Sequence, residues 1–184
     1  RLFVTGGAKS VSGRGSIGYS AGATGNWAVV WGAGSVWSNM EHLFVGHGGA
    51  NNGLVVSNGG VVYGADGFVG ELSSATGNLA LVTGAGSVWS NSGSLTVGRY
   101  GSSNRLLIEQ GGVAFSLGGT VGFSNAADNL AVVQGVGSLW SNFSSVVVGD
   151  LFCGGNTLLV TNGGRVFSTG GLIGDWFSTG NTAV

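Results

Sequence analysis

The chain has 184 residues, of which 40 are glycine and none is proline, and its formal net charge is −1. The absence of proline excludes collagen, and a hydrophobic content of 43% is too high for a disordered Gly/Ser linker. The six basic residues are spread along the chain, and no apolar run approaches the ~20 residues of a membrane helix. We therefore expect no nucleic-acid partner and no membrane insertion by this segment.

Two related segments alternate along the chain. The first type is NWAVVWGAGSVWSN from Asn26, with close copies from Asn78 and Asn129. The second type is NGLVVSNGGVVYG from Asn52, with copies from Asn104 and Asn156, and residues 1–25 are the tail of one more copy. Superposing both types gives a period of about 26 residues. The predicted units are residues 1–25, 26–51, 52–77, 78–103, 104–128, 129–155 and 156–180, with 181–184 beginning another.

Each unit holds three short apolar runs separated by glycine-rich turns. The runs read AVV or LVV, then SVW or VVY, then LFV or LTV, and a glycine follows the third. Stacked three-strand units of this kind predict an all-β fold, a parallel β-helix (β-solenoid) of about seven coils. The crossover rule makes it right-handed, and seven coils at ~4.8 Å give a rod of roughly 34 Å.

Both ends of the sequence fall inside the first strand of a unit. Residues 1–4 read RLFV, and residues 182–184 read TAV. Terminal strands of a solenoid need capping, because an uncapped end presents unpaired backbone groups. We therefore expect a single solenoid segment that belongs to a longer chain or packs against a neighbouring copy.

The recurring blocks GAGSVWSN, LxVG, NGGxV and xIG resemble the repeat associated with type V secretion (autotransporter) passengers and PEP-CTERM proteins of bacteria. The resemblance covers nearly the whole chain, and the blocks recur in the same order. It implies an extracellular or bacterial cell-surface location and a β-helical stalk. It implies no catalytic residue.

An asparagine opens every unit after the first and recurs every 25–27 residues. In a solenoid, equivalent positions stack into columns, and stacked amides bond from one coil to the next. We therefore expect a structural asparagine ladder. Its members are Asn26, Asn52, Asn78, Asn104, Asn129, Asn156 and Asn181.

An aromatic residue follows eleven positions after each of the first six ladder asparagines. Stacked aromatic residues either pack inside or form an outward platform for polysaccharide, and the sequence leaves both open. In a straight strand they would share the outer face of Lys9 and Arg165, with Val36 and Val62 facing the core. The candidate ligand-binding or partner-binding residues are Trp37, Tyr63, Trp89, Phe115, Trp140 and Phe167.

The first strand of each unit is apolar on both faces. Positions two and four, such as Leu54 and Val56, must face the core. Position three should then point outward, and an apolar residue there suggests a covering partner. The candidate association face consists of Phe3, Val29, Val55, Leu81, Leu107, Val132 and Leu159.

The remaining polar residues give no clear chemical site. Asp150 and Asp175 are one coil apart, a spacing that suits a glycosidase pair or a calcium site but equally two solvated turn residues. His42 and His47 share one coil without matching metal ligands in neighbouring coils, and Cys153 is the single cysteine. We therefore expect no metal, no cofactor and no enzymatic activity.

These observations favour a structural or adhesive segment, whether stalk, passenger or fibre subunit. The alternative is a carbohydrate-binding module that uses the aromatic column. A polysaccharide-degrading enzyme would need long loop insertions around a cleft, and an ice-binding protein would need a regular outward threonine array. The expected partners are another copy or a neighbouring solenoid segment, and possibly a polysaccharide.

Overall fold

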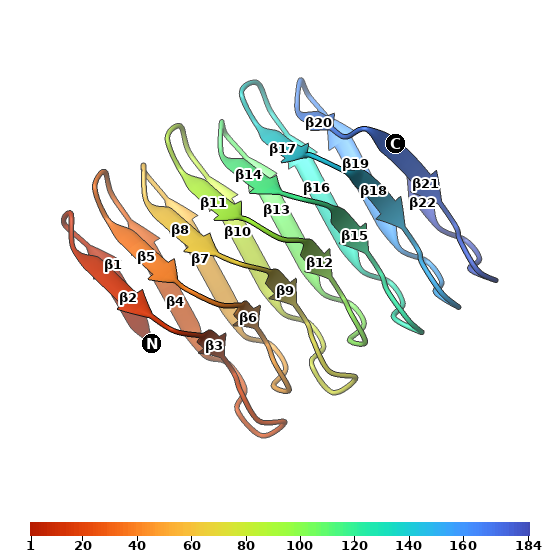
Figure 1. The fold of residues 1–184 in the computed structure, drawn as a ribbon, viewed down its shortest axis with the longest axis horizontal. Coiled ribbons are helices and arrows are strands. Elements are labelled where there is room, and N and C mark those ends of the chain that lie inside the picture. Colours follow the sequence, from red (N-terminus) through yellow and green to blue (C-terminus); the bar gives the residue numbers. More distant parts are fainter.

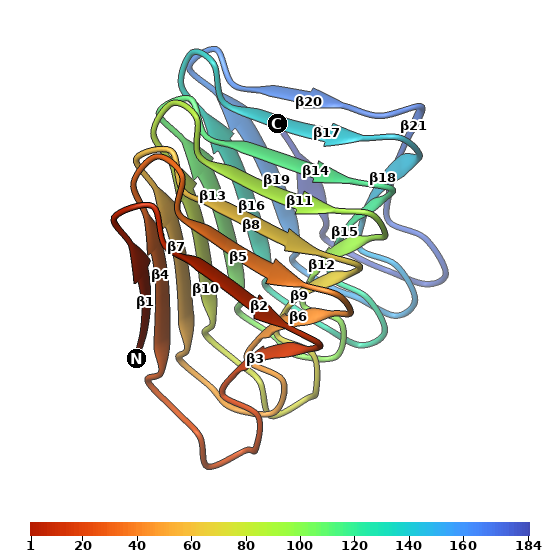
Figure 2. The same ribbon diagram turned by 60° about the vertical axis from the view of Figure 1, so that its left-hand side comes forward.

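A computed structural model describes all residues 1–184, and it forms a stack of three-strand coils (Figure 1). Successive coils lie side by side along the rod, so residues about 26 positions apart in the sequence are neighbours in space (Figure 2). Every strand pairs in parallel with the equivalent strand of the next coil. The predicted parallel β-solenoid is confirmed, whereas its right-handed sense stays a prediction. No helix that could cross a membrane is present.

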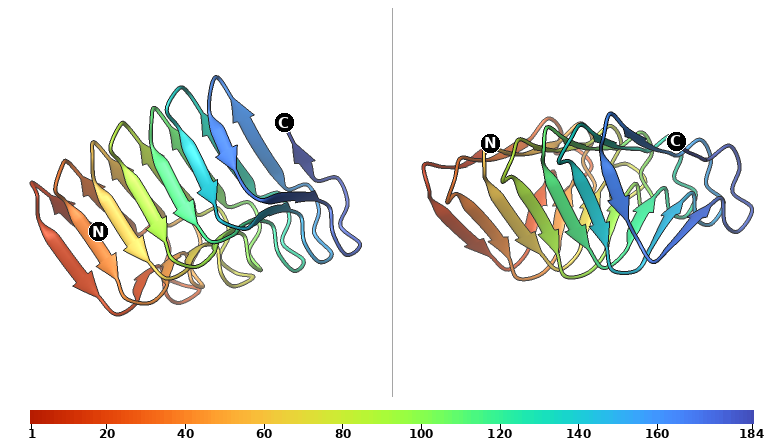
Figure 3. Two further views of the ribbon diagram at one scale, coloured as in Figure 1. Left: turned by 45° about the horizontal axis from the view of Figure 1, so that its top comes forward. Right: turned by 90° about the horizontal axis from the view of Figure 1, so that it is seen from above.

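Three parallel sheets run the length of the rod (Figure 3). Sheet A contains the first strand of each coil: β1 (Leu2–Thr5), β4 (Trp27–Trp31), β7 (Gly53–Ser57), β10 (Leu79–Thr83), β13 (Arg105–Glu109), β16 (Leu130–Gln134), β19 (Thr157–Thr161) and β22 (Thr182–Ala183). Sheet B contains the second: β2 (Lys9–Ser12), β5 (Val36–Asn39), β8 (Val61–Gly64), β11 (Val88–Asn91), β14 (Val113–Ser116), β17 (Leu139–Asn142) and β20 (Arg165–Phe167). Sheet C contains the third: β3 (Gly15–Ile17), β6 (Leu43–Val45), β9 (Gly67–Val69), β12 (Leu95–Val97), β15 (Gly119–Val121), β18 (Ser145–Val148) and β21 (Gly170–Ile173).

The core is one continuous cluster enclosed by the three sheets. Alternate residues of each strand point inward, as the two-residue period of a strand requires. In sheet A, Leu54 and Val56 are fully buried, which confirms the inward assignment of positions two and four. Burial of each such side chain contributes ~1.5–3 kcal/mol. Because the core repeats along the axis, every coil stabilises its two neighbours.

The two repeat types alternate because their side chains complement one another in volume. Trp89 of β11 is fully buried and pairs with Val62 on one side and Ala114 on the other. Strand β9 belongs to the preceding coil, which is of the second repeat type, and it begins with Gly67. A Cβ on Gly67 would collide with the Trp89 indole. A large indole in one coil is thus accommodated by small residues in its neighbours. Native packing density then requires the alternation.

The glycine that closes strand three is fixed by both backbone conformation and space. Gly98 follows β12 with φ of 74°, a left-handed conformation that glycine adopts most easily. A Cβ on Gly98 would also overlap the side-chain amide of Asn129, which opens the second unit further along the chain. The glycine column and the asparagine column are therefore required together.

Candidate functional site

The predicted asparagine ladder is continuous from Asn26, which opens the second coil, to Asn181. The Oδ1 atom of Asn78 accepts the backbone N–H of Asn52 at 2.8 Å and its side-chain Nδ2–H at 3.2 Å. Asn78 in turn donates to Asn104 Oδ1 from the same two groups, at 2.9 and 3.0 Å. The same pattern joins every successive pair up to Asn156 and Asn181. Asn78 is fully buried, so the ladder has a structural role.

The predicted aromatic column does not exist as one column. The strand register pairs Trp37 with Val62, and it pairs Tyr63 with Ser38. The tryptophans among the six candidates lie in the core, with exposures of 5%, 0% and 0% for Trp37, Trp89 and Trp140. The other three lie on the outer face of sheet B, with exposures of 47%, 36% and 55% for Tyr63, Phe115 and Phe167. An unbroken aromatic platform is therefore wrong for this surface.

The split has a simple cause in the turn before strand two. Residues 32–35 connect β4 to β5, whereas only residues 58–60 connect β7 to β8. Because the second turn is one residue shorter, the residue eleven positions after the asparagine falls one place later in strand two. Neighbouring residues of a strand point to opposite faces, so this shift moves the side chain to the other face. The same shift means that Val36 lies on the outer side of sheet B, while Val62 faces the core. The expectation that position ten always faces inward was therefore wrong for the first repeat type.

The candidate association face does form one column on the outside of sheet A. The register joins Phe3 to Val29, Val55 to Leu81, and Leu107 to Val132. The column also includes Leu159, which pairs with Val132. Phe3 is 61% exposed and Val132 is only 7% exposed, with the others between them. The outer face of sheet A thus carries an apolar stripe along the rod.

A recess of about 440 Å³ lies on the outer face of sheet C, and we call it the trough. Three neighbouring columns line it. The outward residues of strand three are Phe68, Thr96 and Thr120; the residues before strand three are His42, Asp66 and Ser94; the residues after it are Arg99, Phe123 and Asp150. The trough therefore combines residues from five consecutive coils, none of which holds the whole set.

One side of the trough carries a histidine–carboxylate pair. His42 Nδ1 lies 3.0 Å from Asp66 Oδ2, close enough for an ion pair when the imidazole is protonated, although the alignment is too poor for a hydrogen bond. Asp66 Oδ1 accepts the backbone N–H of Ser94 at 2.7 Å. The imidazole also meets the Phe44 and Phe68 rings edge-on. Asp66 is thus held in place while both groups remain partly accessible.

On the other side, Arg99 is held by three contacts. Its Nη1 atom donates to Glu71 Oε1 at 2.7 Å, and its guanidinium lies over the Phe68 and Tyr100 rings at 5.5 and 5.3 Å. Glu71 is 7% exposed, and its second oxygen has no partner. The positive charge of Arg99 is therefore offset by Glu71 before any ligand binds.

Asp150 closes the far end of the trough. Burial, and secondarily the charge of Asp175, raise the pKa of the Asp150 carboxyl above its ordinary value, and a hydrogen bond from the Leu151 backbone opposes this only in part. Asp175 accepts the backbone N–H of Trp176 at 2.9 Å. Cys153 is a free, buried thiol whose pKa is raised by burial. Neither Asp175 nor Cys153 lines the trough.

His47 stacks on Tyr19 at 4.6 Å and meets the Phe44 ring edge-on. No group of three or more His, Cys, Asp or Glu side chains is placed to hold a metal ion. The trough residues lie at three repeat positions, one before, one within and one after strand three. Reading each column alone gave no reason to join them, because the recess forms only where three columns meet.

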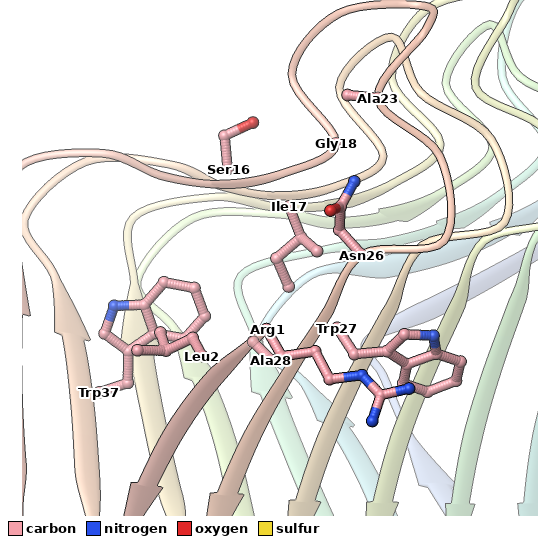
Figure 4. Close-up of a pocket in the computed structure, with 10 residues that line it drawn as sticks. All are labelled: Arg1, Leu2, Ser16, Ile17, Gly18, Ala23, Asn26, Trp27, Ala28 and Trp37. Atoms are coloured by element: carbon pink, nitrogen blue, oxygen red, sulfur yellow. The ribbon is translucent and has the colours of Figure 1, made fainter.

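A second recess, of about 360 Å³, lies at the first coil (Figure 4). In Figure 4, Leu2, Ile17, Ala28 and Trp37 face its interior. These residues belong to the inward columns that fill the core elsewhere. The recess is therefore the end of the core and not a separately built site.

Comparison with known proteins found no match: no family model fits the chain, and neither curated proteins nor solved structures resemble it significantly.

Proposed function

We propose that this chain is a structural and adhesive β-solenoid segment of a bacterial surface or secreted protein, acting outside the cell as a stiff stalk, passenger or fibre subunit. The observation that carries this proposal is the unbroken asparagine ladder, from Asn26 to Asn181, alongside an unbroken core. Each coil is bonded to the next through three sheets and the ladder, so the rod resists separation of its coils. The function proposed is mechanical and involves no catalytic step.

The extracellular location is supported by the resemblance of the GAGSVWSN and NGGxV blocks to repeats of secreted and surface-displayed bacterial proteins. Protease treatment of intact cells that carry the gene tests it. Peptides of this segment should be released without lysis. Release only after lysis would contradict an extracellular location.

Single-molecule pulling from the two ends tests the mechanical role. We expect stepwise release of coils, each adding 26 residues or roughly 90 Å of extended chain. Asn78→Ala should lower the force of the steps in the middle of the rod. A single low-force extension of the whole chain would contradict a load-bearing role.

The apolar stripe on sheet A supports a second part of the proposal, which is packing against another solenoid segment or a second copy. An apolar stripe of this kind is more typical of an interface than of a free surface. Sedimentation velocity of the chain and of Leu81→Lys tests it. We expect association of the unchanged chain and monomers for the variant, with equal melting temperatures. Monomers in both would contradict this part.

A further inference from the structure

We propose that the trough on the outer face of sheet C is a binding site for a neutral saccharide. The assignment names the ligand of the adhesive role and rests on that role. It is carried by the recess itself, by its hydrogen-bonding groups, by its rings and by its charge. Each of these is independent of the aromatic positions predicted from the sequence.

The trough has the size and the polar lining that a saccharide of one or two rings requires. Its volume of about 440 Å³ lies within the range of small-molecule sites. Thr96 and Thr120 supply hydroxyls that both donate and accept, and Asp66 and Asp150 supply carboxylate oxygens that accept. A sugar ring presents hydroxyls in several directions, so alternating donors and acceptors around a shallow recess match its surface.

Phe123 and the edge of the Phe68 ring add apolar contacts for the C–H groups of a sugar ring. Phe68 is packed between the Phe44 ring, at 5.2 Å, and the Arg99 guanidinium, so it is held in place by its neighbours. Phe123 meets the Tyr100 ring edge-on at 6.3 Å. The two phenylalanines lie two coils apart, with Thr96 on the coil between them and Thr120 on the same coil as Phe123. This order suits a ligand that is apolar on its ring faces and polar at its edges.

The charge of the trough selects against acidic ligands. Arg99 is already paired with Glu71, and His42 lies against Asp66. Asp150 has no basic partner, and the nearby Asp175 adds negative charge. A uronic acid or a phosphate would therefore meet uncompensated carboxylates, whereas a neutral sugar would use them as hydrogen-bond acceptors.

The test measures binding of the whole chain to immobilised oligosaccharides. Half of them are built from neutral hexoses and N-acetylhexosamines, and the other half contain uronic acids. A neutral oligosaccharide that binds is then titrated in solution. Thr120→Phe should fill the recess and weaken binding by about tenfold or more. The strand accepts phenylalanine there, because Phe44 and Phe68 occupy the same column as Thr120. Asp150→Asn should weaken binding several-fold.

Ser90→Phe on the outer face of sheet B is the matched control, since Tyr63 and Phe115 are its neighbours there. It should bind as the unchanged chain does, and the melting temperatures of Thr120→Phe and Ser90→Phe should match that of the unchanged chain. Absence of binding to every neutral saccharide, preference for uronic acids, or equal binding by Thr120→Phe would overturn the assignment. Loss of binding in Ser90→Phe alone would also overturn it, and would place the site on sheet B. Pulling experiments are measured separately, so the mechanical proposal can stand if this one fails.

Discussion

The indole N–H of Trp89 has no hydrogen-bond partner, and Gly64 stands where the two equivalent tryptophans find a serine. Trp37 donates to Ser12 Oγ and Trp140 donates to Ser116 Oγ, both at 3.2 Å. Those serines also donate to the asparagines two residues after each tryptophan. In the third coil the missing hydroxyl leaves both Trp89 Nε1 and Asn91 Oδ1 unpaired.

Gly64→Ser should therefore stabilise the protein. A Cβ at this position would have no neighbour closer than 3.5 Å, and Gly64 does not have a positive φ. The new hydroxyl would pair two buried groups, each of which costs ~1–3 kcal/mol when unpaired, so we expect a gain of about 1–3 kcal/mol in the free energy of unfolding. Denaturant unfolding measures it. Gly64→Ala is the control, and equal stability of the two variants would show that the hydroxyl is not what the site lacks.

Asn78→Ala should remove one rung from the middle of the ladder. Two donors of Asn52 would lose their acceptor inside the protein, at a cost of about 2–5 kcal/mol. Asn26→Ala is the matched control, because no other ladder asparagine donates to Asn26, and its loss should cost less. Thermal and denaturant unfolding give both values. An unchanged midpoint for Asn78→Ala would rule out a structural ladder.

Gly98→Ala and Gly6→Ala separate backbone strain from steric overlap. Both glycines have positive φ, at 74° and 64°, but a Cβ on Gly98 would meet Asn129 whereas Gly6 has nothing within 4 Å. Gly6→Ala should cost ~1 kcal/mol of strain, and Gly98→Ala about 1–3 kcal/mol more. Their unfolding free energies are directly comparable. Equal losses would mean that the Asn129 side chain moves aside freely.

Truncation of Trp89 and of Tyr63 should have very different effects. Trp89 is fully buried, so Trp89→Ala leaves a cavity and should lower the free energy of unfolding by about 3–5 kcal/mol. Tyr63 lies on the surface, so Tyr63→Ala should change it by less than ~0.5 kcal/mol. Equilibrium unfolding of the two variants measures the difference. Similar losses would argue for one aromatic column after all.

Asp150→Asn should raise the melting temperature at neutral pH. Because the pKa of Asp150 is raised in the folded state, ionisation of its carboxyl favours the unfolded chain. The free energy of unfolding therefore falls as the pH rises from the ordinary carboxyl pKa of about 3.9 to the higher pKa of the folded state. The gain should therefore vanish below about pH 3. Asp175→Asn should lower the pKa of Asp150 towards its ordinary value, which carboxyl NMR titration measures. A destabilising Asp150→Asn at neutral pH would contradict this sign.

The sequence by itself determined the solenoid, because its glycines recur with a period of about 26 residues and a leading asparagine opens every unit after the first. Asn52 and Asn78 could be paired from their spacing alone, and the inward positions Leu54 and Val56 followed from the two-residue period of a strand. Side-chain direction in strand two did not follow, because it depends on a one-residue difference between two turns that counting from the asparagine conceals. Only the register of β5 with β8 placed Trp37 inside and Tyr63 outside.

The trough was decided by tertiary structure alone. Its residues come from five coils and three columns, and each column taken singly looks irregular. His42 meets Asp66 because residues 24 positions apart become neighbours when one coil stacks on the next. A repeat in the sequence determines which positions stack on one another. It does not determine whether the side chains of two neighbouring columns enclose a recess. Phe68, Thr96 and Phe123 come from three different coils, and only the packed structure brings them to one recess.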